Sequence, residues 1–270
     1  MITRVSPGQI ETYRRDGFVG LPGFLTPEEV DELRQAVLAA VAITEKRVIA
    51  GHSAYYDSVW TRRVNLWRVN DTVRRYLLDR ELGRLLCELA GVDGLRVWHD
   101  QTLIKEPYAN PTAWHMDSPN WSFCSRQAIS IWIALQDATM GNGCMWFVPG
   151  SQEIADFELS GATSTIDESL DSLFDVYPEM TKIDTVPVPM HAGDCSFHNG
   201  MTAHGAGANM TRGRRIAMTC SYMPVGSVFN GQQNVLEDDY FGRLVEGDVL
   251  ENDDWNPVIY RKIDQNSGPA

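Results

Sequence analysis

Hydrophobic positions in the first ninety residues recur at the spacing of helices. One apolar stripe consists of Val30, Leu33, Val37 and Val41. Positions three and four apart lie on one face of a helix, so this stripe predicts a helix with one buried side. The residues before it mark its start, because Thr26 suits the N-cap, Pro27 the first helical position and Glu29 the capping box. We therefore expect a helix from Pro27.

A second helical pattern starts at Asp79. Its apolar positions also fall on one face: Leu82, Leu85, Leu86 and Leu89. Gly91 follows them, and glycine is the residue that most often ends a helix in the left-handed conformation. The pattern predicts a helix that begins after Asp79 and is capped at Gly91.

After Gly94 the pattern changes to short runs rich in aromatic and β-branched residues, separated by turn residues. Five runs are predicted to be strands: Leu95–Ile104, Ala128–Leu135, Cys144–Val148, Asp194–His198 and Ile216–Met223. Strands and helices do not alternate regularly, which disfavours a doubly wound parallel sheet. The pattern favours a mainly β sandwich or jelly roll with helices packed outside.

The chain is expected to form a single domain over residues 1–270. We divide it into a helical part at about 1–93, a jelly-roll core at about 94–225 and a C-terminal extension at 226–270. Residues 155–180 are polar and weakly periodic. Long segments of this kind are often functional, so we interpret this one as an insertion that covers a pocket as a lid.

Composition narrows the classes of partner. Hydrophobic residues make up 43% of the chain, enough for a buried core, and the formal net charge is −13. That charge disfavours nucleic acid and anionic membranes, which attract basic surfaces. Five scattered cysteines without a C-x-x-C pair favour reduced thiols, and no apolar leader or membrane-spanning run is evident. We expect a cytoplasmic protein that acts on a small molecule; its oligomeric state is not indicated.

The candidate chemistry begins with His115-Met116-Asp117. In an extended segment, side chains two residues apart point to the same face, so His115 and Asp117 should both face the interior, with Met116 pointing away. A histidine from another strand would complete two imidazoles and one carboxylate, a ligand set that suits Fe(II) and leaves positions open. An H-x-D triplet also arises by chance among six histidines and many aspartates. The assignment therefore depends on a downstream partner.

Three downstream histidines compete for the third ligand position. His191 stands in a glycine-containing turn and is expected to be exposed. His198 ends a predicted strand and fits an interior histidine or one beside the ligands. His204 opens a glycine-rich hairpin whose far strand begins near Arg215, which would set an arginine beside the metal. We favour His204 over His198.

Four ordered segments make the pattern more specific. They are Trp114–Pro119, Ile131–Leu135, Asn142–Ser151 and His204–Arg215. Together with Asp16–Thr26 they resemble the phytanoyl-CoA dioxygenase family over about residues 10–225. The resemblance implies a double-stranded β-helix, the jelly-roll fold of the cupins, with helices outside it. It also implies an oxygenase that uses Fe(II), 2-oxoglutarate and O₂.

Carried over residue by residue, the resemblance implies that His115, Asp117 and His204 are the iron ligands and catalytic residues. It implies that Arg215 binds the distal carboxylate of 2-oxoglutarate. Its planar guanidinium can donate two parallel hydrogen bonds, which lysine cannot reproduce. Arg214 is the near rival, but it should point to the opposite face of the strand as a surface charge.

Further positions have expected roles in the same pocket. Trp132 resembles the aromatic wall that the family places beside the co-substrate, and Gln101 is expected to donate a hydrogen bond to a 2-oxoglutarate carboxylate. Arg63 is expected near the same pocket. Ala206 departs from the family, in which many members have a serine there. Asp117 distinguishes the chain from related halogenases, which have a small residue at that position.

The expected reaction is hydroxylation of an unactivated C–H bond in a small metabolite, for instance in natural-product tailoring, with release of succinate and CO₂. The same cofactor chemistry also gives epimerisation, desaturation or ring formation. Acyl-CoA is disfavoured because the acidic chain has no evident basic cluster. Two alternatives of another class stay open, a non-redox cupin-type metalloenzyme and a non-catalytic binding protein. Candidates for lining the substrate pocket are Met116, Asn120, Trp121, Phe123 and Trp146.

Overall fold

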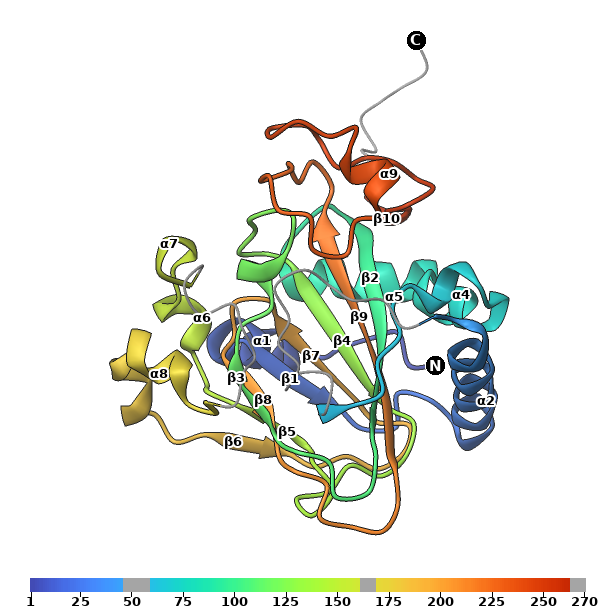
Figure 1. Ribbon diagram of the computed structural model, residues 1–270, viewed down its shortest axis with the longest axis vertical. Coiled ribbons are helices and arrows are strands. Elements are labelled where there is room, and N and C mark those ends of the chain that lie inside the picture. Colours follow the sequence, from blue (N-terminus) through green and yellow to red (C-terminus); the bar gives the residue numbers. More distant parts are fainter. Residues whose placement is uncertain (46–58, 161–168, 263–270) are drawn as a thin grey trace.

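Two antiparallel sheets form the centre of the computed structural model, which describes residues 1–45, 59–160 and 169–262 (Figure 1). The six-stranded sheet has the order β1 (Phe18–Leu21), β7 (Cys195–Asn199), β4 (Ile129–Ala134), β9 (Arg215–Pro224), β2 (Gly94–Lys105) and β10 (Val258–Arg261). The four-stranded sheet has the order β3 (Thr112–His115), β8 (His204–Ala206), β5 (Met145–Phe147) and β6 (Val186–Val188). The two sheets are the halves of a double-stranded β-helix, which confirms the predicted fold class.

The five predicted strands are confirmed as β2, β4, β5, β7 and β9, and each observed boundary differs from the predicted one by one residue. Within the larger sheet the side chains alternate between two environments, as the pleat requires. Ile131 and Met218 belong to the hydrophobic core under the helices, whereas their neighbours Trp132 and Thr219 line a cavity between the sheets. One face of the sheet therefore supports the helices, and the other contributes to the site.

Helices cover the outer face of the larger sheet (Figure 1). They are α1 (Pro7–Asp16), α2 (Pro27–Ile43), the short η1 (Leu66–Arg68), α4 (Asp71–Leu77) and α5 (Arg80–Ala90). Both predicted helices are confirmed. The Thr26 hydroxyl accepts from the Glu29 N–H at 3.3 Å, and the Glu29 carboxylate accepts from the Thr26 N–H at 2.9 Å. Asp79 caps the start of α5, and Gly91, with φ 70°, caps its end.

The described parts of the predicted insertion contain the short helices α7 (Phe157–Ser160) and α8 (Ser172–Val176). The helix α6 (Ser151–Ile154) directly precedes the insertion, and η3 (Pro178–Lys182) runs past its end. Leu173, Tyr177 and Met180 are buried and belong to one cluster with Met116, which follows β3. Residues 161–168 lie outside the described residues, and the lid role of the insertion stays a prediction.

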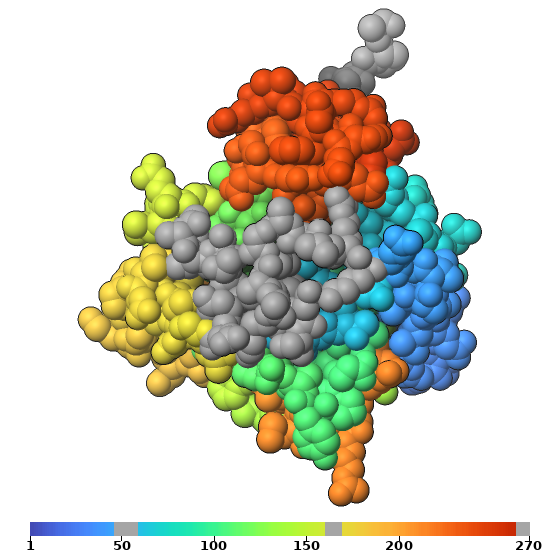
Figure 2. Space-filling view, viewed as in Figure 1, coloured from blue at the N-terminus to red at the C-terminus, as the bar shows by residue number. Residues whose placement is uncertain are grey.

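The segment after β9 packs over one end of the sheets, where Figure 2 shows it in orange and red. It contains α9 (Asp238–Phe241) and returns to the larger sheet as β10. Phe229, Leu236 and Leu250 are buried in one cluster with Trp121. Among the described residues, none of the helices combines the length and apolar character needed to cross a lipid bilayer.

Candidate metal centre and co-substrate pocket

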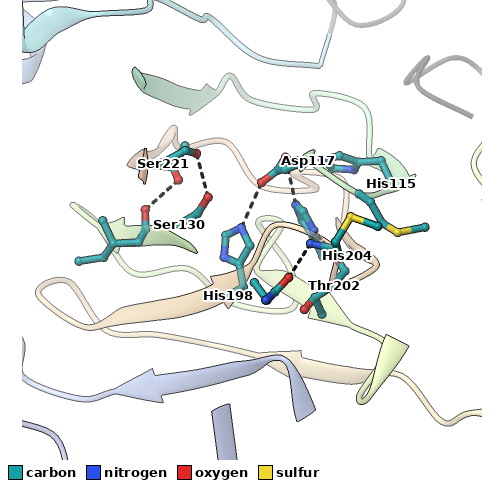
Figure 3. A network of polar contacts seen from close by, with 12 residues as sticks. His115, Asp117, Ser130, His198, Thr202, His204 and Ser221 are labelled. Carbon is teal, nitrogen blue, oxygen red and sulfur yellow. Dashed lines mark hydrogen bonds and ion pairs between the residues drawn. The ribbon is translucent and has the colours of Figure 1, made fainter. Parts of the chain in front are cut away.

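His115, Asp117 and His204 come together between the two sheets. His115 is the last residue of β3 and His204 the first of β8, and the antiparallel register pairs them directly. One ligand atom from each of the three side chains lies within 4.8 Å of the other two. Figure 3 shows the three side chains turned toward one another. Strand pairing thus joins two histidines that are far apart in the sequence.

Asp117 reaches the cluster through a turn, which corrects the prediction that it extends the strand of His115. β3 ends at His115, and Asp117 has helical angles, φ −79° and ψ −51°, just before η2 (Ser118–Asn120). The backbone N–H groups of Asp117 and the next residue both donate to the Gly200 carbonyl, at 3.0 and 2.8 Å. Met116 does point away, as predicted, and packs among buried apolar side chains.

Backbone carbonyls orient both imidazoles. The Nδ1 atoms of His115 and His204 lie 2.8 Å from the Ala113 carbonyl oxygen and 2.9 Å from the Thr202 carbonyl oxygen, respectively. A carbonyl oxygen only accepts, so Nδ1 donates and Nε2 keeps its lone pair for a metal. The Nε2 atoms lie 3.7 Å (His115) and 3.9 Å (His204) from Oδ1 of Asp117.

Burial and the contacts among its members set the protonation of this cluster. It lowers the pKa of His115 and lowers that of His204 to about 3, so both imidazoles are neutral near pH 7. Burial opposes ionisation of Asp117, but the facing imidazoles of His204 and His198 outweigh it and hold the pKa of this carboxyl well below its usual range. Two neutral nitrogen donors and one carboxylate on one face fit a divalent iron ion with open positions.

A buried arginine lies in the cavity that the cluster lines. The Arg215 side chain is 1% exposed, and its Nε and Nη1 atoms have no hydrogen-bond partner among the described residues. Its guanidinium carbon lies 5.2 Å from the ring centroid of Trp132, which lines the same cavity. Burial lowers the pKa of Arg215 to about 10, so it is still charged near pH 7. Arg214 is exposed and donates to Glu106 at 2.8 Å, as expected of a surface charge.

Gln101 also lines this cavity, and Arg62 orients it. The Nε atom of Arg62 donates to Oε1 of Gln101 at 2.6 Å, which leaves the amide NH₂ as the donor end of Gln101. Arg63, expected near the pocket, instead donates to the backbone carbonyls of Thr44 and Arg62. The arginine of this pair that lines the cavity is therefore Arg62.

Thr112 is a cavity residue that sequence reasoning missed. Its hydroxyl is buried and has no hydrogen-bond partner among the described residues. The register pairs Thr112 with Ala206, the position at which the family resemblance implies a serine. A hydroxyl therefore remains on this wall, contributed by the neighbouring strand. The pairing of β3 with β8 could not be determined from the sequence, which contains no pattern that fixes this register.

Other walls of the cavity come from distant parts of the chain. Of the five predicted substrate-pocket residues, Asn120 and Trp121 line it, whereas the other three do not. Further lining residues that were not predicted include Trp60, His99 and Asn234. The amide oxygen of Asn234 is buried without a hydrogen-bond partner among the described residues. The C-terminal segment thus contributes a polar group to the cavity.

Two imidazoles and a carboxylate inside a double-stranded β-helix, with an arginine facing the same cavity, define a non-haem metalloenzyme. The family model described as "Phytanoyl-CoA dioxygenase (PhyH)" matches residues 13–217, and the chain belongs to this family. It is a non-haem Fe(II)- and 2-oxoglutarate-dependent dioxygenase. This membership disfavours the two alternatives, a non-redox cupin-type metalloenzyme and a non-catalytic binding protein.

Similar proteins include a dioxygenase and two enzymes from nogalamycin biosynthesis. The chain is 30% identical over 221 residues to the dioxygenase FrzG of a Cladobotryum species, across 74% of this chain and 68% of FrzG. The alpha-ketoglutarate-dependent carbocyclase SnoK from nogalamycin biosynthesis is 29% identical with a TM-score of 0.78, across 94% of this chain and 96% of SnoK. The epimerase SnoN, solved with Fe³⁺, alpha-ketoglutarate and nogalamycin RO, is 30% identical with a TM-score of 0.75, across 93% and 97% of the chains.

Proposed function

We propose that His115, Asp117 and His204 hold Fe(II), that Arg215 binds the distal carboxylate of 2-oxoglutarate, and that the enzyme oxidises a C–H bond of a small metabolite. The buried guanidinium of Arg215 carries this proposal, because it lies in the same cavity as the three ligands. A buried charge without a counter-charge is costly in free energy, and a dicarboxylate co-substrate would supply the counter-charge.

Three further residues of the pocket position the co-substrate. Trp132 lies against the guanidinium of Arg215 and forms a wall that excludes water. The amide of Gln101 and the hydroxyl of Thr112 offer further hydrogen bonds to carboxylate oxygens. Bound iron, together with 2-oxoglutarate and O₂, supplies the oxidising power, with succinate and CO₂ as co-products. The protein contributes by holding the substrate in place and keeping water away.

Hydroxylation is the default outcome that we propose, and a second candidate is ring closure or epimerisation. The similarity to the carbocyclase SnoK and the epimerase SnoN supports the second candidate. Aromatic side chains of Trp60 and Trp121 line the cavity, and flat rings of this kind favour a cyclic or aromatic substrate. We propose a cyclic natural-product intermediate as the substrate class.

We also propose that residues 1–270 act as one catalytic domain. The larger sheet takes β1 from the helical part and β10 from the C-terminal extension, which supports one unit better than separate ones. We propose a cytoplasmic location as well. All five cysteines lie in the described part of the chain and are unpaired, as in a reducing compartment.

An anaerobic titration tests the proposed cofactor site. Addition of Fe(II) and then 2-oxoglutarate should produce a visible metal-to-ligand charge-transfer band, and admission of air should yield succinate. His204→Ala should abolish both signals. His191→Ala is the matched control, because His191 is an exposed histidine outside the cavity, and it should retain them. Absence of the band and of succinate in the wild-type protein would contradict the proposal.

A further inference from the structure

His198 contacts the carboxylate of Asp117. It lies in β7, its side chain is 2% exposed, and its Nε2 atom is 3.3 Å from Oδ2 of Asp117. The other oxygen, Oδ1, is the one that faces Nε2 of His115 and of His204. Figure 3 shows His198 pointing at Asp117 from the larger sheet. The two oxygens of one carboxylate therefore have different partners.

We propose that His198 is a positioning residue that holds Oδ2 of Asp117, so that Oδ1 is the oxygen presented to the metal. This inference rests on the proposed iron site. An ionised carboxylate has no proton to donate and can only accept a hydrogen bond. In this contact the donor is therefore the N–H at Nε2 of His198. Such a bond fixes the orientation of a ligating carboxylate and strengthens metal binding.

His198 is well placed for this role and poorly placed to be a ligand. Its ring packs beside those of Phe147 and His204, with centroid distances of 5.6 and 4.8 Å. It is absent from the group of side chains whose ligand atoms all lie within 4.8 Å of one another. Its Nδ1 atom has no hydrogen-bond partner among the described residues, so its polar contact is made through Nε2.

The neighbouring polar side chains do not compete for His198. The register places Ser130 opposite His198 on one side and opposite Ser221 on the other. The hydroxyls of Ser130 and Ser221 bond to each other at 2.8 Å. One of these hydroxyls donates to the other, and the side-chain acceptor that His198 contacts is Asp117.

Two substitutions of His198 distinguish the effect of its N–H donor from the effect of its ring shape. His198→Phe keeps an aromatic ring but removes the N–H, whereas His198→Gln keeps an N–H donor at a similar reach. For His198→Phe we expect Fe(II) affinity to fall roughly 10- to 100-fold, measured by anaerobic titration. His198→Gln should restore most of the loss. The charge-transfer band with 2-oxoglutarate should shift in His198→Phe, because the ligand carboxylate has changed its orientation.

Controls make each outcome decisive. Ser196→Ala removes another buried polar group of β7 and should leave both Fe(II) affinity and the band unchanged. Thermal unfolding of the metal-free variants checks that they fold. Unchanged Fe(II) affinity in folded His198→Phe would overturn the inference, as would equal losses in the Phe and Gln variants. Fe(II) binding to the wild-type protein is measured first. Absence of iron binding there would contradict the proposed function rather than the role of His198.

Discussion

Arg215 and Arg214 are adjacent in the chain but have opposite surroundings. The guanidinium of Arg215 is buried in the cavity, and that of Arg214 is exposed and paired with Glu106. Arg215→Lys keeps the charge but loses the forked donor geometry, so 2-oxoglutarate affinity should fall by roughly 10- to 100-fold, the value of one or two charge-assisted hydrogen bonds. Fe(II) affinity should not change, and isothermal titration can measure both constants.

The matched control is Arg214→Lys, the same substitution at the neighbouring position. It should leave 2-oxoglutarate binding unaffected because it alters only a surface ion pair. A loss in the Arg214 variant with full binding in the Arg215 variant would reverse the assignment of the two arginines.

Lys105 is a second buried basic side chain, opposite Arg215 in the pairing of β2 with β9. Burial, and then the charge of Arg215, lower the pKa of Lys105 to about 6. The unfolded chain keeps the ordinary value of 10.5, so folding releases a proton between these two pH values. The contribution of Lys105 to the free energy of unfolding is therefore fully present above pH 10.5. It is lost as the pH falls toward 6.

Denaturant unfolding of the metal-free protein should therefore show a free energy of unfolding that rises with pH across this window. Release of one proton on folding changes the free energy of unfolding by at most about 1.4 kcal/mol per pH unit. Lys105→Met should flatten this part of the profile. Lys262→Met, which removes an exposed lysine paired with Asp93, should not. Identical slopes for the wild type and Lys105→Met would show that Lys105 stays protonated in the folded protein.

Among the elements, the link between β7 and β8 holds the backbone of Asp117. The Gly200 carbonyl accepts from two successive N–H groups there, and a Cβ at Gly200 would lie 2.4 Å from Oγ of Ser118 and 2.9 Å from the Trp121 ring. Gly200→Ala should therefore force this turn away from Asp117. We expect it to destabilise the protein by roughly 1–3 kcal/mol and to weaken Fe(II) binding.

Gly213→Ala provides the matched comparison. A Cβ at Gly213 meets nothing within 4 Å, so this variant should match the wild type in both chemical denaturation and Fe(II) titration. Weakened iron binding in both variants would mean that the effect does not come from the contact with Ser118 and Trp121.

At the level of the whole molecule, the proposed ligands come from segments that only the folded chain brings together. Iron and 2-oxoglutarate should therefore bind the native state far better than the unfolded chain. At a ligand concentration of about 100 Kd, such binding stabilises the native state by about 2.7 kcal/mol. The melting temperature should rise with Fe(II) concentration under anaerobic conditions, and EDTA should reverse the rise.

His204→Ala tests whether this stabilisation comes from the proposed site. It should remove the dependence of the melting temperature on Fe(II), because one of the three ligands is lost. A melting temperature that still rises with Fe(II) in this variant would place the stabilising ion elsewhere.

Local patterns in the sequence predicted two of the helices and five of the strands. The capping box at Thr26, the leucine stripe after Asp79 and the five β runs all correspond to observed elements, because caps and hydrophobic periodicity act over a few residues. The H-x-D motif and the downstream histidine also placed His115, Asp117 and His204 among the candidates. Their role as iron ligands stays a prediction.

Only the tertiary structure decided which side chains meet. The turn at Asp117, the hydroxyl of Thr112 opposite Ala206, the cavity position of Arg62 and the contact of His198 with Asp117 all depend on strand register or loop packing. Register changes by whole residues with little effect on local propensity, yet each step reverses the face of every side chain. The sequence by itself therefore determined which chemical groups this protein has, and the pairing of distant strands decided how they are arranged around the cavity.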